Sequence, residues 1–119
     1  MTQLPLWQAP SRDPKRDPRV GDSLSVQLAT EDGDIRLHSI EVLGILDLRN
    51  GPRISVRLID VAKNKAYTEH LTLVQWWEGQ GFKVPPITLL RSGEGWMVYV
   101  ERESFWVASV AELAVRLLP

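Results

Sequence analysis

The residues best suited to acid–base or metal chemistry are two histidines, His38 and His70. Imidazole exchanges its proton near neutral pH and is a common metal ligand, so either residue could act as a general base or hold an ion. Glu69 precedes His70 in an expected strand, where neighbours point to opposite faces, so these two cannot bind one ion together. An enzyme would require His38 or His70 to meet carboxylates that the local sequence does not place beside them.

The sequence lacks the motifs of the common catalytic and nucleotide-binding classes. It contains no Gly-x-Ser-x-Gly pentapeptide of a serine hydrolase, and neither GxGxxG nor GxxxxGK[ST] to cradle a phosphate. It contains no cysteine, which excludes disulfides, thiolate catalysis and cysteine-bound zinc or iron–sulfur clusters. We therefore predict that the protein is not an enzyme, with no catalytic residue, no metal site and no cofactor.

Five tryptophans in 119 residues make aromatic contacts the next candidate. Trp76 and Trp77 fall on the apolar arc of a short expected helix, which favours core packing. Trp96 alternates in phase with two valines that are expected to face the core, so Tyr99 lies on the opposite face of that strand. Trp106 is out of phase with its two neighbours, so one of the two faces exposes an aromatic unless the closing helix covers it. Tyr99 and Trp106 are the predicted binding residues for a protein partner.

Basic residues near the start of the chain offer a second kind of contact. Arg12, Lys15, Arg16 and Arg19 lie in a proline-rich stretch, and flexible basic segments can follow a phosphate backbone. Aspartates interleave with them and the whole chain carries a net charge of -1, so the stretch is only weakly basic. These four residues are the predicted contacts of an alternative function, nucleic-acid binding. The other interpretation of the stretch is a solvated tail without a binding role.

Alternating apolar residues predict the strands that must position these groups. Leu24, Val26 and Leu28 share one strand face, and a phase slip farther on suggests a β-bulge near His38 and Ser39. Residues 40–48 and 53–61 flank an Asn-Gly turn, which predicts a hairpin. Further strands are expected at residues 66–71, 87–90, 96–100 and 105–107.

Two short helices are predicted from capping signals. Thr72 and Gln75 stand at capping-box spacing before the tryptophan pair, and Gly79 is placed to end that helix in the left-handed conformation. Ser109 and Glu112 repeat the spacing before an apolar stripe that ends the chain.

These elements predict a mainly β fold bordering on α+β, a small barrel or roll of antiparallel strands with two short capped helices. We expect a Pro-rich N-terminal arm at residues 1–19 and a single β-rich domain at 20–119, barrel-like over 20–82 with a hairpin and C-terminal helix over 83–119. No run reaches the ~20 apolar residues of a membrane span and the start is not a secretory signal, so we expect a cytoplasmic protein without membrane contacts.

One part of the chain resembles a known group of proteins. Residues 16–78 contain Arg16-Asp17-Pro18-Arg19-Val20-Gly21-Asp22, short strands and a tryptophan-bearing segment. This stretch resembles small uncharacterised phage and prophage proteins that open with a Pro-Arg-x-Gly-Asp turn and form a Src-homology-type β-barrel. The resemblance implies an accessory protein of a phage or mobile element that acts by binding and has no catalytic residues to transfer.

The favoured hypothesis is therefore a non-catalytic interaction module that binds a host protein. A nucleic-acid-binding β-barrel that uses the basic arm is the alternative, and a small enzyme that uses His38 or His70 is the third. The sequence leaves the oligomeric state open.

Overall fold

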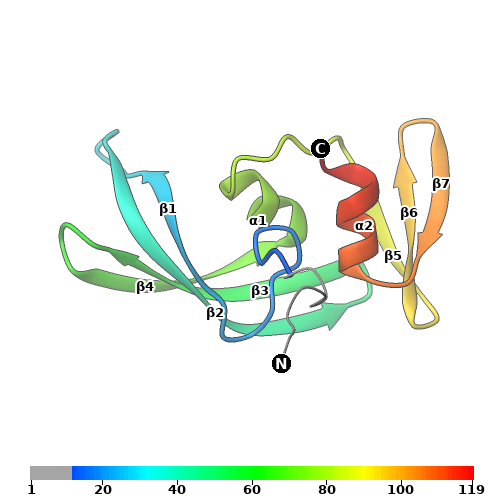
Figure 1. Cartoon of the computed structure of the whole chain (residues 1–119), viewed down its shortest axis with the longest axis horizontal. Helices are drawn as coiled ribbons and strands as arrows, with labels where there is room; N and C mark the ends of the chain where they lie inside the picture. Colours follow the sequence, from blue (N-terminus) through cyan, green and yellow to red (C-terminus); the bar gives the residue numbers. More distant parts are fainter. Residues whose placement is uncertain (1–11) are drawn as a thin grey trace, which may run out of the picture.

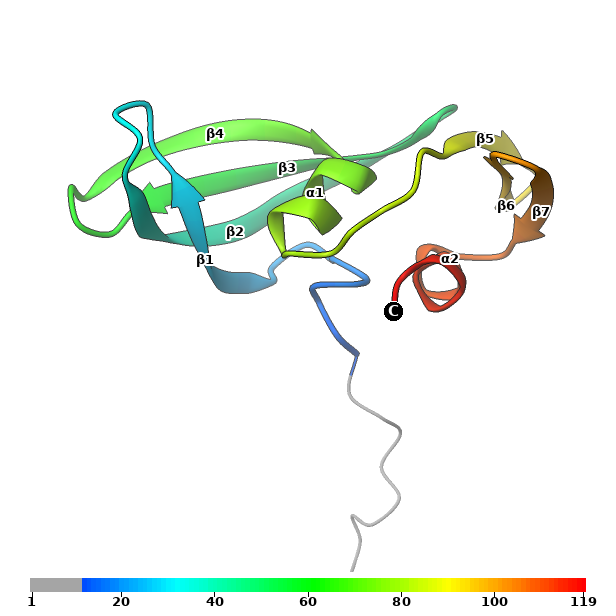
Figure 2. The same cartoon turned by 90° about the horizontal axis from the view of Figure 1, so that it is seen from above.

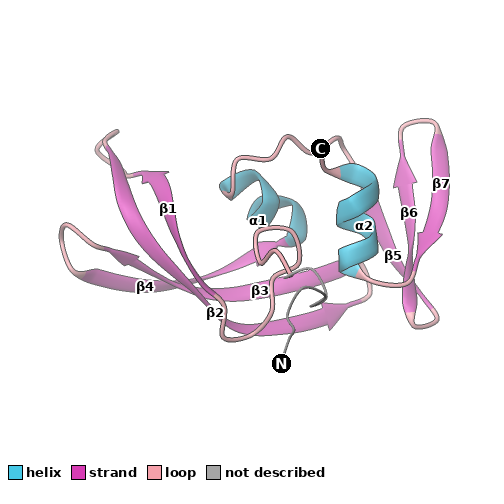
Figure 3. Cartoon of the chain, in the orientation of Figure 1, coloured by secondary structure: helices cyan, strands magenta, loops and turns pink. Residues whose placement is uncertain are grey.

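The alternating residues build seven strands and two helices within residues 12–119, the part of the chain that the computed structural model describes. The strands are β1 (Ser23–Ala29), β2 (Ile35–Leu48), β3 (Gly51–Asp60), β4 (Lys65–Thr72), β5 (Thr88–Ser92), β6 (Gly95–Val100) and β7 (Glu103–Val107). The helices are α1 (Leu73–Gly79) and α2 (Val110–Leu117). The predicted mainly β class with two short helices is confirmed (Figure 3).

The strands form two antiparallel sheets, one with the order β1-β2-β3-β4 and one with the order β5-β6-β7 (Figure 1). Within residues 12–119 they do not close into a barrel, so the barrel form of the prediction is wrong. The connection from α1 to β5 contains Pro85 and Pro86, which have no backbone N–H to donate to a sheet ladder. The first sheet ends at β4, and β5 starts the second one.

The long strand β2 corrects a second expectation. It pairs with β3 without interruption through His38 and Ser39, and its bulge falls later, between Val42 and Gly44. The apparent slip arose because Ile35 and Leu37 sit on the solvent face, with exposed fractions of 70% and 43%. Because these two side chains are apolar, the sequence pattern wrongly indicated that they face the core.

The core lies between the inner faces of the two sheets and the helices. Figure 2 shows α1 against the four-stranded sheet and α2 beside the three-stranded one. Trp76 and Trp77 are completely buried, as are Ile54, Val56 and Leu113. The prediction that the tryptophan pair packs in the core is confirmed.

Local capping signals fix where each helix begins. Thr72 accepts a hydrogen bond from the Gln75 backbone N–H, and the Gln75 side chain accepts one from the Thr72 N–H, which completes the predicted capping box. Ser109 caps α2 through the Glu112 N–H. Gly79 is the last residue of α1, as predicted, but it does not adopt the left-handed conformation, which falls two residues later at Gly81, with φ of 95°. No helix within residues 12–119 has the length and apolar character needed to cross a bilayer.

Candidate interaction surface

The three-stranded sheet places four large side chains on a face that no helix or strand of residues 12–119 covers. Its register sets Leu90 beside Met97 and Met97 beside Trp106, while Tyr99 lies next along β6 on the same face. Trp106 is 47% exposed, Tyr99 43% and Leu90 37%. We call Leu90, Met97, Tyr99 and Trp106 the outer patch. Both aromatic residues predicted for a protein contact therefore lie on one exposed surface.

Trp106 of β7 is held in one orientation because its ring crosses β6 at Gly95 and reaches β5. Its indole Nε1–H donates a hydrogen bond to the Ser92 carbonyl oxygen over 3.0 Å. The ring lies directly over Gly95, where an added Cβ would overlap the indole and the Val107 carbonyl oxygen. A tryptophan with a hydrogen-bonded N–H and a flat backbone support loses little rotamer freedom when a partner binds.

The opposite face of the same sheet packs against the closing helix. Val98 and Val107 are completely buried there with Leu113 of α2. Phe105 also points inward, and the Arg116 guanidinium lies 3.8 Å from its ring centroid. Since α2 covers the Phe105 face, Trp106 is the aromatic left exposed, which settles the alternative that the sequence left open.

Residues 12–19 of the predicted arm lie against the body of the protein, and residues 1–11 lie outside the described residues. The Trp76 indole N–H donates to the Lys15 carbonyl oxygen over 3.0 Å, and the Trp77 indole N–H donates to the Arg16 carbonyl oxygen over 2.9 Å. Pro18 is buried. This segment thus supplies the hydrogen-bond acceptors for the two buried indole N–H groups.

The arginines of this segment are paired with its own aspartates and with Asp22. Arg12 binds Asp22 through two hydrogen bonds of 2.7 Å each, and this bond, against the opposing effect of burial, holds the pKa of Asp22 below its ordinary value. Arg16 lies 3.3 Å from Asp13, and Arg19 lies 3.1 Å from Asp17. Lys15 forms no ion pair within residues 12–119. The arm therefore presents little uncompensated positive charge.

The two histidines occupy opposite faces of the four-stranded sheet. His38 lies opposite Asp60 on the inner face and is 2% exposed. His70 lies opposite Ser55 on the outer face, where its Nδ1 is 2.8 Å from the Ser55 hydroxyl. A side-chain period of two puts Ser55 and Asp60 on different sides of β3, so the imidazoles cannot share one site.

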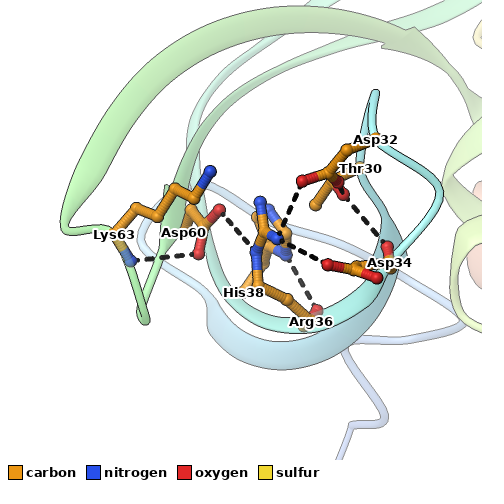
Figure 4. A network of polar contacts seen from close by, with 7 residues as sticks. All are labelled: Thr30, Asp32, Asp34, Arg36, His38, Asp60 and Lys63. Atoms are coloured by element: carbon orange, nitrogen blue, oxygen red, sulfur yellow. Dashed lines mark hydrogen bonds and ion pairs between the residues drawn. The ribbon is translucent and has the colours of Figure 1, made fainter.

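His38 belongs to a polar network at the end of this sheet where β1 turns into β2 and β3 turns into β4 (Figure 4). Its Nδ1 lies 3.0 Å from the Arg36 carbonyl oxygen, while Arg36 Nε donates to Asp60 over 3.1 Å. Burial by itself would raise the pKa of Asp60, but the Lys63 N–H and the Arg36 guanidinium outweigh it and lower that pKa. No group of three or more potential metal ligands occurs among the described residues. One carboxylate oxygen of Asp60 accepts from Arg36 and the other accepts from the Lys63 N–H. The network is therefore a set of hydrogen bonds that joins the two strands and the turn.

Sequence reasoning missed this network, although one signal for it exists. Arg36 and His38 alternate with Ile35 and Leu37, so one of the two sets must face inward. The polar set does so here because Asp60 on β3 supplies the compensating charge. Only the pairing of β2 with β3 reveals that charge.

Comparison of the chain with protein-family models, with curated proteins and with solved structures gave no match.

Proposed function

We propose that this protein is a non-catalytic module that binds a protein partner through the outer patch. The observation that supports this proposal is the fixed, half-exposed Trp106, which stands in one row with Met97 and Leu90 and beside Tyr99. Tryptophan and tyrosine are enriched at the centres of protein interfaces, because each buries a large area at a small entropic cost. An apolar strand face with aromatic side chains suits a protein surface better than a polyanion.

The alternative, nucleic-acid binding through the arm, has less support. Three of its four predicted contacts, Arg12, Arg16 and Arg19, are ion-paired to aspartates of the chain itself. Binding phosphates would require these pairs to break, which offsets the gain from releasing counterions. The resemblance of residues 16–78 supports an accessory role for a phage or mobile element, with a host protein as the partner. The absence of cysteine from the sequence supports a reducing, cytoplasmic setting.

The test is to immobilise the protein, identify what it retains from a bacterial lysate, and then titrate the purified partner against defined variants. Trp106→Ala should weaken binding about thirtyfold or more, since an interface tryptophan typically contributes about 2 kcal/mol or more. Val115→Ala is the matched control, because Val115 is an exposed apolar residue on α2, outside the outer patch. Urea unfolding of each variant reports whether the fold is intact.

Equal affinity of wild type and a folded Trp106→Ala variant would contradict the proposal. A retained species that is nucleic acid, released steeply by salt and lost on neutralising Arg12, Lys15, Arg16 and Arg19, would replace it with the alternative.

A further inference from the structure

The strand β4 is an open edge of the four-stranded sheet. It pairs with β3 on one side, and no other described strand pairs with it on the other. Every residue from Lys65 to His70 is exposed, and the strand contains neither proline nor glycine. Alternate residues of such a strand direct their N–H and C=O groups outward, so β4 offers a free ladder to a further strand.

The side chains of β4 are complementary to their own sequence. The register with β3 puts Lys65 opposite Asp60 and Tyr67 opposite Leu58, and it therefore places Lys65, Tyr67 and Glu69 on the inner face. Lys65 and Glu69 stand at equal distances along the strand on either side of Tyr67. An antiparallel copy of β4, centred on Tyr67, would set each Lys65 opposite Glu69 of the second copy and the two Tyr67 side chains opposite one another.

The charges needed for this pairing are free. Neither Lys65 nor Glu69 forms an ion pair within residues 12–119. A charged residue on a strand edge normally opposes pairing, because a second strand would take it out of water alone. In this register Lys65 of each chain instead lies opposite Glu69 of the other chain, so the dimer contains two pairs of unlike charges.

The other edge strands of the described sheets lack this property. β1 (SLSVQLA) has no charged residue, β5 (TLLRS) has one arginine, and β7 (ESFWV) has one glutamate. None of the three can oppose unlike charges when it pairs with itself in antiparallel fashion. Charge complementarity thus selects both the strand and its register.

We propose that two copies of this chain associate through their β4 strands, paired antiparallel about Tyr67, so that two four-stranded sheets become one sheet of eight strands. The contact is separate from the outer patch, which lies on the three-stranded sheet. A dimer of this kind would carry two outer patches, but neither proposal requires the other.

The test uses charge reversal at the two positions, with the mass of the purified full chain measured by sedimentation velocity over a wide range of concentration. Lys65→Glu alone would set two carboxylates opposite one another at each pair, and Glu69→Lys alone would set two ammonium groups there. Each single variant should dimerise about ten- to a hundredfold more weakly than wild type, because two attractive pairs become repulsive. The variant that carries both changes restores unlike pairs and should dimerise as wild type does.

A mixture of the two single variants gives the sharpest outcome. A Lys65→Glu chain and a Glu69→Lys chain match each other at both pairs, so an equimolar mixture should dimerise about as tightly as wild type, although each variant alone dimerises weakly. Simple misfolding of the variants could not produce this recovery. A wild type that stays monomeric at every concentration, a dimer insensitive to either reversal, or a mixture that fails to recover would each overturn the proposal. Association of β4 with a strand of another protein only would appear as the first of these outcomes.

Discussion

At the scale of single residues, the outer patch depends on a residue without a side chain. Gly95 opens β6 directly beneath the Trp106 indole, and the space there has no room for a Cβ. The hydrogen bond from Trp106 to Ser92 fixes the same ring from its edge. The position of the exposed aromatic is therefore decided by two residues, Gly95 and Ser92, that do not belong to the outer patch.

We expect Gly95→Ala to displace Trp106 and to destabilise the protein by about 1–3 kcal/mol, the usual cost of overfilling a packed site. Urea unfolding gives the free energy, and tryptophan fluorescence reports the change around the indole. Gly79→Ala is the control, because its added Cβ meets no atom within 4 Å beyond its chain neighbours and the backbone of its own helix. That change should leave stability unchanged or raise it by up to about 1 kcal/mol. Equal stability of the Gly95→Ala variant and wild type would show that the strands shift apart without cost.

At the scale of elements, α1 does more than fill the core, because it also binds the segment before β1. Its two buried indoles each donate to a backbone carbonyl of residues 15 and 16. Arg12 closes the segment by bonding to the Asp17 carbonyl and to both Asp22 oxygens. The segment and the helix are therefore expected to open together.

We expect Arg12→Ala to speed trypsin cleavage after Lys15 and Arg16 by about five- to thirtyfold. Losing the paired bond would make local opening easier by roughly 1–2 kcal/mol, and cleavage requires that opening. Mass spectrometry of timed digests measures the rate. Arg19→Ala is the matched control, because the Arg19 side chain is 64% exposed and its ion pair with Asp17 contributes little. Cleavage at the same rate in both variants would mean that Arg12 does not hold the segment.

At the scale of the whole molecule, paired carboxylates join distant parts of the chain. Asp22 ties the N-terminal segment to the start of β1, and Asp60 ties β3 to β2. The pKa of each lies below the ordinary value of 3.8, and the Thr30 hydroxyl, with Arg36 nearby, lowers the pKa of exposed Asp32 to about 2. Folding therefore favours the ionised form of all three groups.

We expect stability to fall as the pH drops from about 4 to about 2. A folded-state pKa below the unfolded one contributes stability that is fully present above the unfolded pKa and is lost as the pH falls through the folded pKa. Urea unfolding at a series of pH values measures this loss. Asp60→Asn should be less stable than wild type at pH 7 and should converge with it at low pH, since the wild-type carboxyl is then neutral. Curves that stay parallel over this range would exclude Asp60 as a source of the pH dependence.

The sequence alone determined the features that depend on near neighbours. Thr72 and Gln75 cap a helix from three residues apart, and the helical arc of α1 buries Trp76 and Trp77. The Asn50-Gly51 signal marks the hairpin of β2 and β3, in which Gly51 has a positive φ and pairs with Leu48. Each follows from bonds or periodicities that close within one or two turns of chain. The position of Tyr99 on the strand face opposite Trp96 likewise followed from alternation along a single strand, whereas its exposure did not.

Only the tertiary structure decided how these elements face one another. Alternation shows which residues share a strand face but not which face meets the core. The pattern therefore indicates that Ile35 and Leu37 face inward, and it predicts the bulge too early in β2. For the same reason the sequence did not reveal that His38 and Asp60 lie opposite one another on the inner face. Two sheets formed in place of a barrel because β4 and β5 do not pair across the proline-containing connection. The bonds from Trp76 and Trp77 to the N-terminal segment join residues 61 positions apart. Such contacts depend on the closure of long loops, whose free energy no local pattern encodes.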